Sequence, residues 1–268
     1  MATTVGYVVH GHGPVRVLAL HGWLGDSSSF KPLLPAIDEN RFTLACIDYR
    51  GYGSSRSMPG PFDINTIAQD AAAVADSLQW DSYSVVGHSM GGKAALRLAL
   101  NVPRRVCNIL AITPVWAGKV PFDEPTLAVF RGAAADLSLR EAIISNTTGG
   151  RLPATWSRHI AHDSAAAAIP EAFASYFESW ALDDFANEAA RLQIRTRVVV
   201  GAHDRSITRE VVTQTWLAQL TNASLTVLAE SGHYPMFECP PALAAMFEVA
   251  LPVAPGANPP ITLEVTHV

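Results

Sequence analysis

Gly87-His88-Ser89-Met90-Gly91 is the stretch that decides the fold of this chain. An apolar run over residues 83–86 leads into it, and a helix-forming run over residues 93–100 follows. A serine between a strand and a helix, flanked by glycine two residues away on each side, is typical of a sharp turn that exposes a nucleophile. Glycine removes the Cβ atoms that would collide there, and the helix N-terminus directs N–H groups toward developing negative charge. We therefore expect Ser89 to be a nucleophile at the carboxyl end of a sheet.

The composition is that of a soluble globular protein. The 268 residues are 49% hydrophobic and 16% charged, with a formal net charge of −5. The 19 basic residues are scattered, so we expect no nucleic-acid or membrane partner, while a homodimer stays open. The N-terminus lacks a signal-peptide pattern, which favours a cytoplasmic protein. The three cysteines have no metal-type spacing, and Cys46 and Cys107 lie in apolar runs that predict buried thiols.

Apolar runs of strand length alternate with helical patterns along most of the chain. Such runs predict strands buried on both faces, at residues 15–20, 42–47, 83–86, 106–113 and 198–201. Repeated strand–helix alternation predicts an α/β fold with a doubly wound, mostly parallel sheet.

The alternation lapses in one long stretch, where helical periodicity and aromatic residues replace the strands. Because this stretch follows a strand end, we expect a helical cap inserted over the carboxyl edge of the sheet. The expected organisation is an α/β core of residues 1–113 and 192–250, a helical cap of residues 114–191, and a C-terminal tail of residues 251–268.

A serine hydroxyl needs a base within hydrogen-bond reach and a carboxylate that orients the base. His233 lies just past the last predicted strand, and Asp204 follows the strand before it, so both should reach the edge where Ser89 lies. Asp48 also ends a strand, but its Asp-Tyr-Arg-Gly-Tyr-Gly context favours a structural turn with a local carboxylate–guanidinium interaction. No metal-ligand pattern occurs, so we expect neither a metal nor a cofactor.

Acyl transfer also needs two N–H donors for the oxyanion that forms on the substrate carbonyl. One is the backbone N–H of Met90, directly after the nucleophile. The other should come from the loop after the first buried strand, where Gly22 lets the backbone approach, and we assign it to the N–H of Trp23.

These motifs together resemble the α/β-hydrolase superfamily over roughly residues 5–250. The matching stretches are His21-Gly22-Trp23, Asp48-x-Arg-Gly-x-Gly-x-Ser55, Gly87-His-Ser-Met-Gly91-Gly92, Gly201-x-x-Asp204 and Gly232-His233. The stretch around Ser89 is similar to that of small bacterial esterases. The layout also resembles the capped group that contains lactonases, C–C bond hydrolases and cofactor-free haloperoxidases. A serine in place of an aspartate nucleophile argues against epoxide hydrolases and dehalogenases.

The resemblance implies a cofactor-independent serine hydrolase that cleaves a carboxylic ester or lactone through an acyl-enzyme. Three alternatives use the same fold: a C–C bond hydrolase of a diketone-like substrate, a ligand receptor with vestigial turnover, and a cofactor-free dioxygenase that relies on the His–Asp pair. The fold does not identify the substrate.

The cap should select the substrate. Its charges alternate in sign without an Arg/Lys cluster, so we expect a neutral, largely apolar acyl or aryl group held by burial. Trp116, just past a strand end, is the first candidate for the cavity wall. The full set of expected substrate contacts is Trp23, His88, Trp116, Phe122, Trp156, Tyr176 and Trp180.

Overall fold

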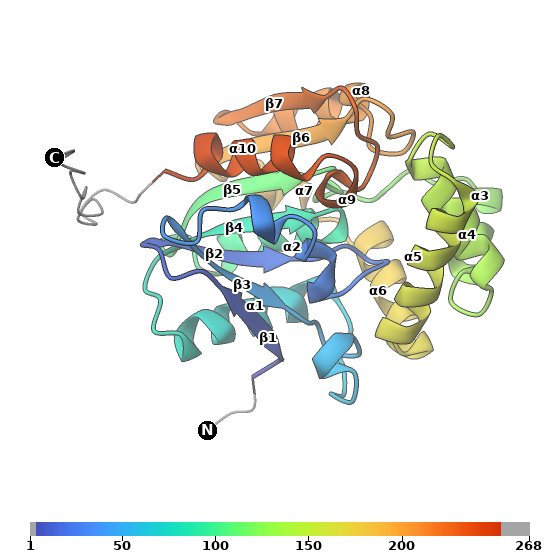
Figure 1. Cartoon of the computed structure of the whole chain (residues 1–268), viewed down its shortest axis with the longest axis horizontal. Coiled ribbons are helices and arrows are strands. Elements are labelled where there is room, and N and C mark those ends of the chain that lie inside the picture. The colour runs from blue at the N-terminus through green and yellow to red at the C-terminus, as the bar shows by residue number, and fades with distance from the viewer. Residues whose placement is uncertain (1–3, 253–268) are drawn as a thin grey trace, which may run out of the picture.

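The computed structural model describes residues 4–252 and contains a seven-stranded sheet with helices on both faces (Figure 1). The strand order is β1-β3-β2-β4-β5-β6-β7. Strand β1 (Tyr7–His10) pairs antiparallel with β3 (Phe42–Ile47), and every other neighbouring pair is parallel. The remaining strands are β2 (Val15–Leu20), β4 (Tyr83–His88), β5 (Val106–Ile112), β6 (Arg195–Gly201) and β7 (Ala223–Leu228). The predicted doubly wound, mostly parallel sheet is confirmed.

Helices cover both faces of this sheet, and alternate strand residues pack into two cores. In β2, Leu18 and Leu20 belong to the core that includes residues of α1 (Ile64–Ser77) and α2 (Met90–Asn101). Val17 and Ala19 belong to the opposite core, which includes residues of α10 (Pro240–Ala250). Burial on both faces explains why the central strands are nearly continuous apolar runs.

The turn after β4 has a strained backbone. Ser89 has φ 53° and ψ −115°, a conformation that residues with a side chain seldom adopt. A Cβ on Gly87 would lie 2.3 Å from the Gly91 carbonyl oxygen, and a Cβ on Gly91 would lie 2.3 Å from the Leu20 carbonyl oxygen. Glycine is therefore required on both sides of Ser89, as the sequence pattern indicates. The Ser89 N–H donates to the Ile112 carbonyl at 2.9 Å, which places the turn at the carboxyl ends of adjacent strands.

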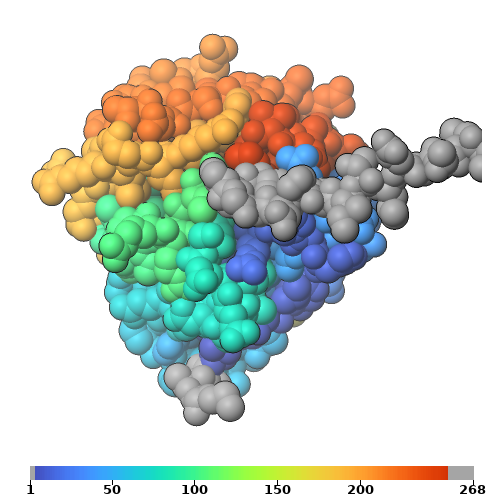
Figure 2. All heavy atoms as spheres, turned by 90° about the vertical axis from the view of Figure 1, so that its left-hand side faces the viewer, coloured from blue at the N-terminus to red at the C-terminus, as the bar shows by residue number. Residues whose placement is uncertain are grey.

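A helical insertion between β5 and β6 lies beyond the carboxyl ends of the strands (Figure 1). The side of the molecule that faces away from the insertion shows the orange and red C-terminal elements above the blue, teal and green elements from earlier in the chain (Figure 2). The helices of the insertion are α3 (Glu124–Gly132), α4 (Leu137–Thr147), α5 (Ala154–Ala167) and α6 (Pro170–Leu182). Three short α-helices, α7 (Ala186–Ala189), α8 (Arg209–Val212) and α9 (Pro235–Glu238), lie outside the sheet and the insertion helices.

Lys93, on α2, ties this insertion to the core. Its Nζ atom donates to the carbonyls of Gly118, Trp180 and Asp183 at 3.1, 3.0 and 2.5 Å. Burial lowers the pKa of Lys93 to about 8, against the opposing influence of Asp183. The helix that begins at the Ser89 turn thus holds both the start and the end of the insertion.

The predicted burial of the cysteines is confirmed for one residue and wrong for another. Cys46 is buried as expected, but Cys107 is exposed near the amino end of β5. The prediction for Cys107 was therefore wrong. An apolar run predicts a strand, but it does not indicate which residues of that strand the neighbouring helices cover. The predicted tail, residues 251–268, lies outside the described residues from position 253 onward.

The carboxylate of Asp48 joins two loops rather than pairing with Arg50. It accepts hydrogen bonds from the Ser27 N–H at 2.8 Å and from the Ser54 N–H and hydroxyl at 2.8 and 2.7 Å. Arg50 instead forms a two-pronged pair with Asp70 at 2.7 and 2.9 Å, so the predicted local pair was wrong. Burial would raise the pKa of Asp48, but the hydrogen bonds from Ser54 and Ser27 outweigh burial and lower it.

We expect Asp48→Asn to lower the free energy of unfolding by about 1–3 kcal/mol at neutral pH, because the amide NH2 replaces one of the two acceptor oxygens and faces buried donors. The folded-state pKa of Asp48 lies below the unfolded value of about 3.9. The contribution of the ionised Asp48 carboxylate to the free energy of unfolding is therefore complete above the unfolded-state pKa. It is lost as the pH falls from that pKa through the lower folded-state pKa. Urea denaturation of the wild type and the variant from neutral to acidic pH measures how the difference in their free energies of unfolding changes with pH.

The matched control is Asp38→Asn, which changes an exposed carboxylate that accepts the Asn40 N–H at 2.9 Å. Its effect should be small at every pH. A difference between wild type and Asp48→Asn that stays constant into acid would contradict the prediction.

Candidate active site

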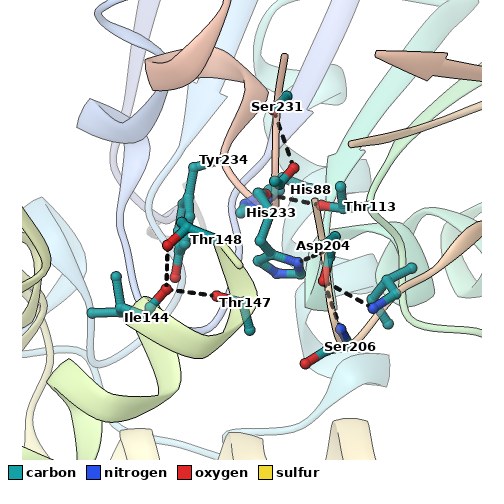
Figure 3. A network of polar contacts seen from close by, with 12 residues as sticks. His88, Thr113, Ile144, Thr147, Thr148, Asp204, Ser206, Ser231, His233 and Tyr234 are labelled. Atoms are coloured by element: carbon teal, nitrogen blue, oxygen red, sulfur yellow. Dashed lines mark hydrogen bonds and ion pairs between the residues drawn. The ribbon is translucent and has the colours of Figure 1, made fainter. Parts of the chain in front are cut away.

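A buried histidine–aspartate pair lies at the carboxyl edge of the sheet (Figure 3). His233 Nδ1 is 2.6 Å from Asp204 Oδ2. The other oxygen of Asp204 accepts the N–H groups of Ser206 and Ile207 at 2.8 and 3.0 Å. These donors hold the carboxylate as an acceptor, so Nδ1 of His233 carries the proton. Nε2 of the same ring is left with a lone pair that can accept a proton.

The backbone of His233 is also fixed by hydrogen bonds. Its N–H donates to the Thr147 carbonyl at 3.2 Å. Its carbonyl accepts from His88 Nε2 at 2.8 Å and from the Thr113 hydroxyl at 3.1 Å (Figure 3). Burial, followed by the neighbouring His233, lowers the pKa of His88 well below its usual value. His88 is therefore neutral, and its single N–H stands on the nitrogen that faces the carbonyl.

Ser89 lies against the loop that follows β2. A Cβ placed on Gly22 would lie 3.3 Å from the Ser89 Cβ and 2.6 Å from His88 Nδ1. Glycine therefore permits the close approach of this loop to the serine. Trp23 is anchored in turn, because its Nε1 donates to the Phe173 carbonyl of α6 at 2.7 Å and its ring stacks on Phe173 at 4.0 Å.

A cavity of about 850 Å³ opens between the sheet edge and the insertion, and both Ser89 and His233 line it. Most of the wall is apolar. Two carboxylates, Asp26 and Asp163, also line it, whereas none of the described lining residues is a lysine or arginine. Within the described part of the chain, no group of three or more His, Cys, Asp or Glu side chains could hold a metal ion.

The predicted substrate contacts divide into two groups. Four of them line the cavity: Trp23, His88, Phe122 and Trp180. The other three, Trp116, Trp156 and Tyr176, lie outside the lining and pack against other aromatic rings. Trp116 meets Trp216 edge to face at 5.4 Å, and Trp156 meets Tyr234 edge to face at 5.6 Å. Tyr176 is fully buried against Tyr52.

Sequence reasoning missed several cavity residues. Phe130, on α3, stacks on Phe122 at 4.9 Å, and both rings line the cavity. Ile143, Ile207, Tyr234 and Phe237 also line the cavity. Tyr234 follows His233 directly, so its position beside the predicted base was an available signal. Nothing in the sequence distinguishes Phe130 from the aromatic residues that only pack the insertion.

The chain belongs to the alpha/beta hydrolase fold family, whose model matches residues 15–240. The strand order, the strained turn at Ser89 and the buried His233–Asp204 pair described above are consistent with this membership. No helix within residues 4–252 has the length and apolar character needed to cross a membrane.

Individual proteins resemble this chain to different extents. It is 34% identical over 103 residues to a human serine hydrolase-like protein, a match that covers 37% of this chain and 50% of the relative. It therefore spans about half the length of that relative. Among solved structures, an esterase from Exiguobacterium antarcticum has a TM-score of 0.82 at 19% identity, covering 91% of this chain and 94% of the esterase. Est816, described as an N-acyl homoserine lactone degrading enzyme, has a TM-score of 0.78 at 22% identity, covering 91% and 96%.

We expect Gly22→Ala to slow labelling of Ser89 by a fluorophosphonate by about 100-fold, because a displacement of about 1 Å is enough for such a loss. The new methyl group would collide with His88, whose other ring nitrogen is held by the His233 carbonyl. The loop must then move away from Ser89, or His88 must release the carbonyl. Time-resolved labelling followed by mass spectrometry measures the rate.

Gly25→Ala is the matched control in the same loop. There a Cβ would meet the Ser29 hydroxyl oxygen at 2.2 Å, and a serine hydroxyl can rotate away. Its labelling rate should stay near that of the wild type. Equal rates for the two alanine variants would contradict the role assigned to the Gly22 approach.

Proposed function

We propose that this protein is a serine hydrolase that cleaves a neutral, largely apolar carboxylic ester or lactone through an acyl-enzyme. The observation that carries the proposal is the 2.6 Å pair of His233 and Asp204 beside the cavity that Ser89 also lines. In this proposal Ser89 is the nucleophile, His233 the general base and Asp204 the carboxylate that orients the base.

In the first half of the reaction, Ser89 Oγ attacks the substrate carbonyl carbon while Nε2 of His233 takes the hydroxyl proton. The oxyanion of the tetrahedral intermediate accepts hydrogen bonds from the N–H groups of Met90 and Trp23. Met90 is the first residue of α2, so its N–H has no acceptor within the helix. When the intermediate collapses, the alcohol oxygen leaves with the proton from Nε2; in a lactone it stays attached to the acyl chain.

In the second half, water replaces the alcohol. Nε2 of His233 takes a proton from the water as its oxygen attacks the acyl carbonyl, and the same proton passes to Ser89 Oγ as the acid is released. The Nδ1 bond to Asp204 holds the ring in one tautomer and stabilises the imidazolium in both halves.

The cavity wall supports a neutral and largely apolar substrate. Trp23, Phe122, Phe130 and Trp180 contribute aromatic surface to it. The lining carboxylates of Asp26 and Asp163 would repel an anionic acyl group, since no described lining residue offers a cation in return. Burial of apolar substrate surface at about 25 cal/mol per Å² then supplies most of the binding free energy.

Substitution of the three residues tests the chemistry. Ser89→Ala, His233→Ala and Asp204→Asn should each lower kcat for p-nitrophenyl butyrate by about 10⁴-fold or more, and combinations should lower it little further because the residues act as a unit. Steady-state hydrolysis with fluorophosphonate labelling measures both turnover and the identity of the nucleophile.

Ser29→Ala is the control, since Ser29 also lines the cavity but has no part in the proposed reaction. A Ser89→Ala variant with the wild-type rate would refute the mechanism. Wild-type protein that is labelled at Ser89 but turns over no ester, lactone or diketone would favour the ligand receptor instead. Faster cleavage of diketones than of esters would favour the C–C bond hydrolase.

We expect Phe130→Ala to raise KM for neutral apolar esters and to change the order of preference across an ester series. Loss of the ring removes apolar contact from the cavity wall while the reacting groups stay in place. Trp116→Ala, outside the lining, is the matched aromatic control and should keep the wild-type order. Measuring kcat and KM for neutral and anionic esters tests this, and a preference for anionic esters in the wild type would contradict the proposed substrate class.

A further inference from the structure

A buried carboxylate accepts hydrogen bonds from the loop that carries His233. Glu238 is the last residue of α9, and its side chain is only 1% exposed. One oxygen accepts the N–H of Gly232 at 2.8 Å, and the other accepts the N–H of Tyr234 at 2.9 Å. The carboxylate therefore bridges the residues immediately before and after the histidine, so the backbone at His233 cannot shift without breaking one of these bonds.

The charge of this carboxylate is balanced by a cation from the insertion. Arg151 follows α4, and its guanidinium forms an ion pair with Glu238. The same Nη2 atom donates to the carbonyl of Glu230 at 2.7 Å, at the start of the loop that leads to His233. A carboxylate buried without a counterion is strongly unfavourable. The ion pair with Arg151 therefore offsets the cost of burying the charge of Glu238.

Every backbone N–H from residue 232 to residue 234 is thus bonded to a group outside the loop. Glu238 accepts two of them, and the Thr147 carbonyl of α4 accepts the N–H of His233. Backbone hydrogen bonds to a charged acceptor are stronger than those to a neutral one. The two Glu238 bonds are therefore expected to be the stronger of these three N–H bonds.

We propose that Glu238 is a positioning residue for His233 and that Arg151 supports it from the insertion. Glu238 touches neither the cavity nor Asp204; it acts by fixing the backbone from which the imidazole projects. This inference rests on the proposed hydrolase function, in which His233 must present Nε2 to Ser89 and Nδ1 to Asp204 in both halves of the reaction. Misplacement by about 1 Å is enough to lower a rate 100-fold.

The variant Glu238→Gln tests the proposal with almost no change in shape. Its amide nitrogen would face one of the two loop N–H groups, so only one of the two bonds could survive. We expect kcat for p-nitrophenyl butyrate to fall by about 10- to 100-fold while KM stays near the wild-type value. Glu178→Gln is the matched control, because Glu178 forms an ion pair with Arg131 on the exposed surface of the insertion.

A second readout follows the histidine itself and needs no substrate. The proton between His233 Nδ1 and Asp204 should give a low-field ¹H NMR resonance in the wild type and in Glu178→Gln. In Glu238→Gln it should broaden or disappear under conditions where circular dichroism shows a folded protein. If the wild type hydrolyses no ester, the proposed function fails, yet this resonance still decides whether Glu238 positions His233.

Arg151 supplies an independent test should Glu238→Gln fail to fold, since its own side chain is 30% exposed. Arg151→Met should lower kcat and weaken the resonance, whereas Arg151→Lys should restore much of both by keeping the cation. A purely structural role would lower thermal stability and leave the kcat of the folded fraction unchanged. Wild-type kcat together with an unchanged resonance in folded Glu238→Gln, or in Arg151→Met, would overturn the proposal.

Discussion

The left-handed backbone of Ser89 is the constraint on which the rest of the structure depends. A residue with φ 53° costs about 1–3 kcal/mol, so it persists only where its surroundings allow no other conformation. Those surroundings are the two glycines that remove Cβ clashes and the central strands packed on both faces. Because the turn is held by the Ile112 carbonyl of a neighbouring strand, the serine is positioned by the core of the sheet.

His233 is positioned differently, by hydrogen bonds to segments that are distant in the sequence. Its backbone is hydrogen-bonded to the last residue of β4, to the residue after β5 and to the last residue of α4, three segments that are far apart in the chain. The insertion therefore does more than cover the cavity. Any displacement of α4 would remove the Thr147 carbonyl from the His233 N–H, so the geometry of the proposed base depends on the position of the insertion. The hydrogen bonds from Lys93 to the Trp180 carbonyl and from the Trp23 indole to the Phe173 carbonyl hold α6 of the insertion against the core.

How far the sequence predicts this site depends on which kind of interaction places each residue. Ser89, Asp204 and His233 follow predicted strands, and parallel topology brings all their carboxyl ends to one edge, so their proximity could be inferred. Trp116 could not be placed in the same way, because helical periodicity indicates which residues share a face but not which partner that face meets. Glu238 was missed since its partners are backbone N–H groups; an acidic residue directly after the apolar residues 235–237 was the available signal.

Two carboxylates lie near His233 and interact with different parts of it: Asp204 with the ring and Glu238 with the adjacent backbone. Asp204 faces the imidazole and, in the proposed mechanism, stabilises the positive charge that forms on it. Glu238 faces backbone N–H groups and is balanced by Arg151, so it fixes geometry while adding little net charge near the ring. His88 completes the arrangement, because a cationic ring beside His233 would oppose imidazolium formation. Burial keeps its pKa low, and the neutral ring can donate to the His233 carbonyl without competing for Asp204.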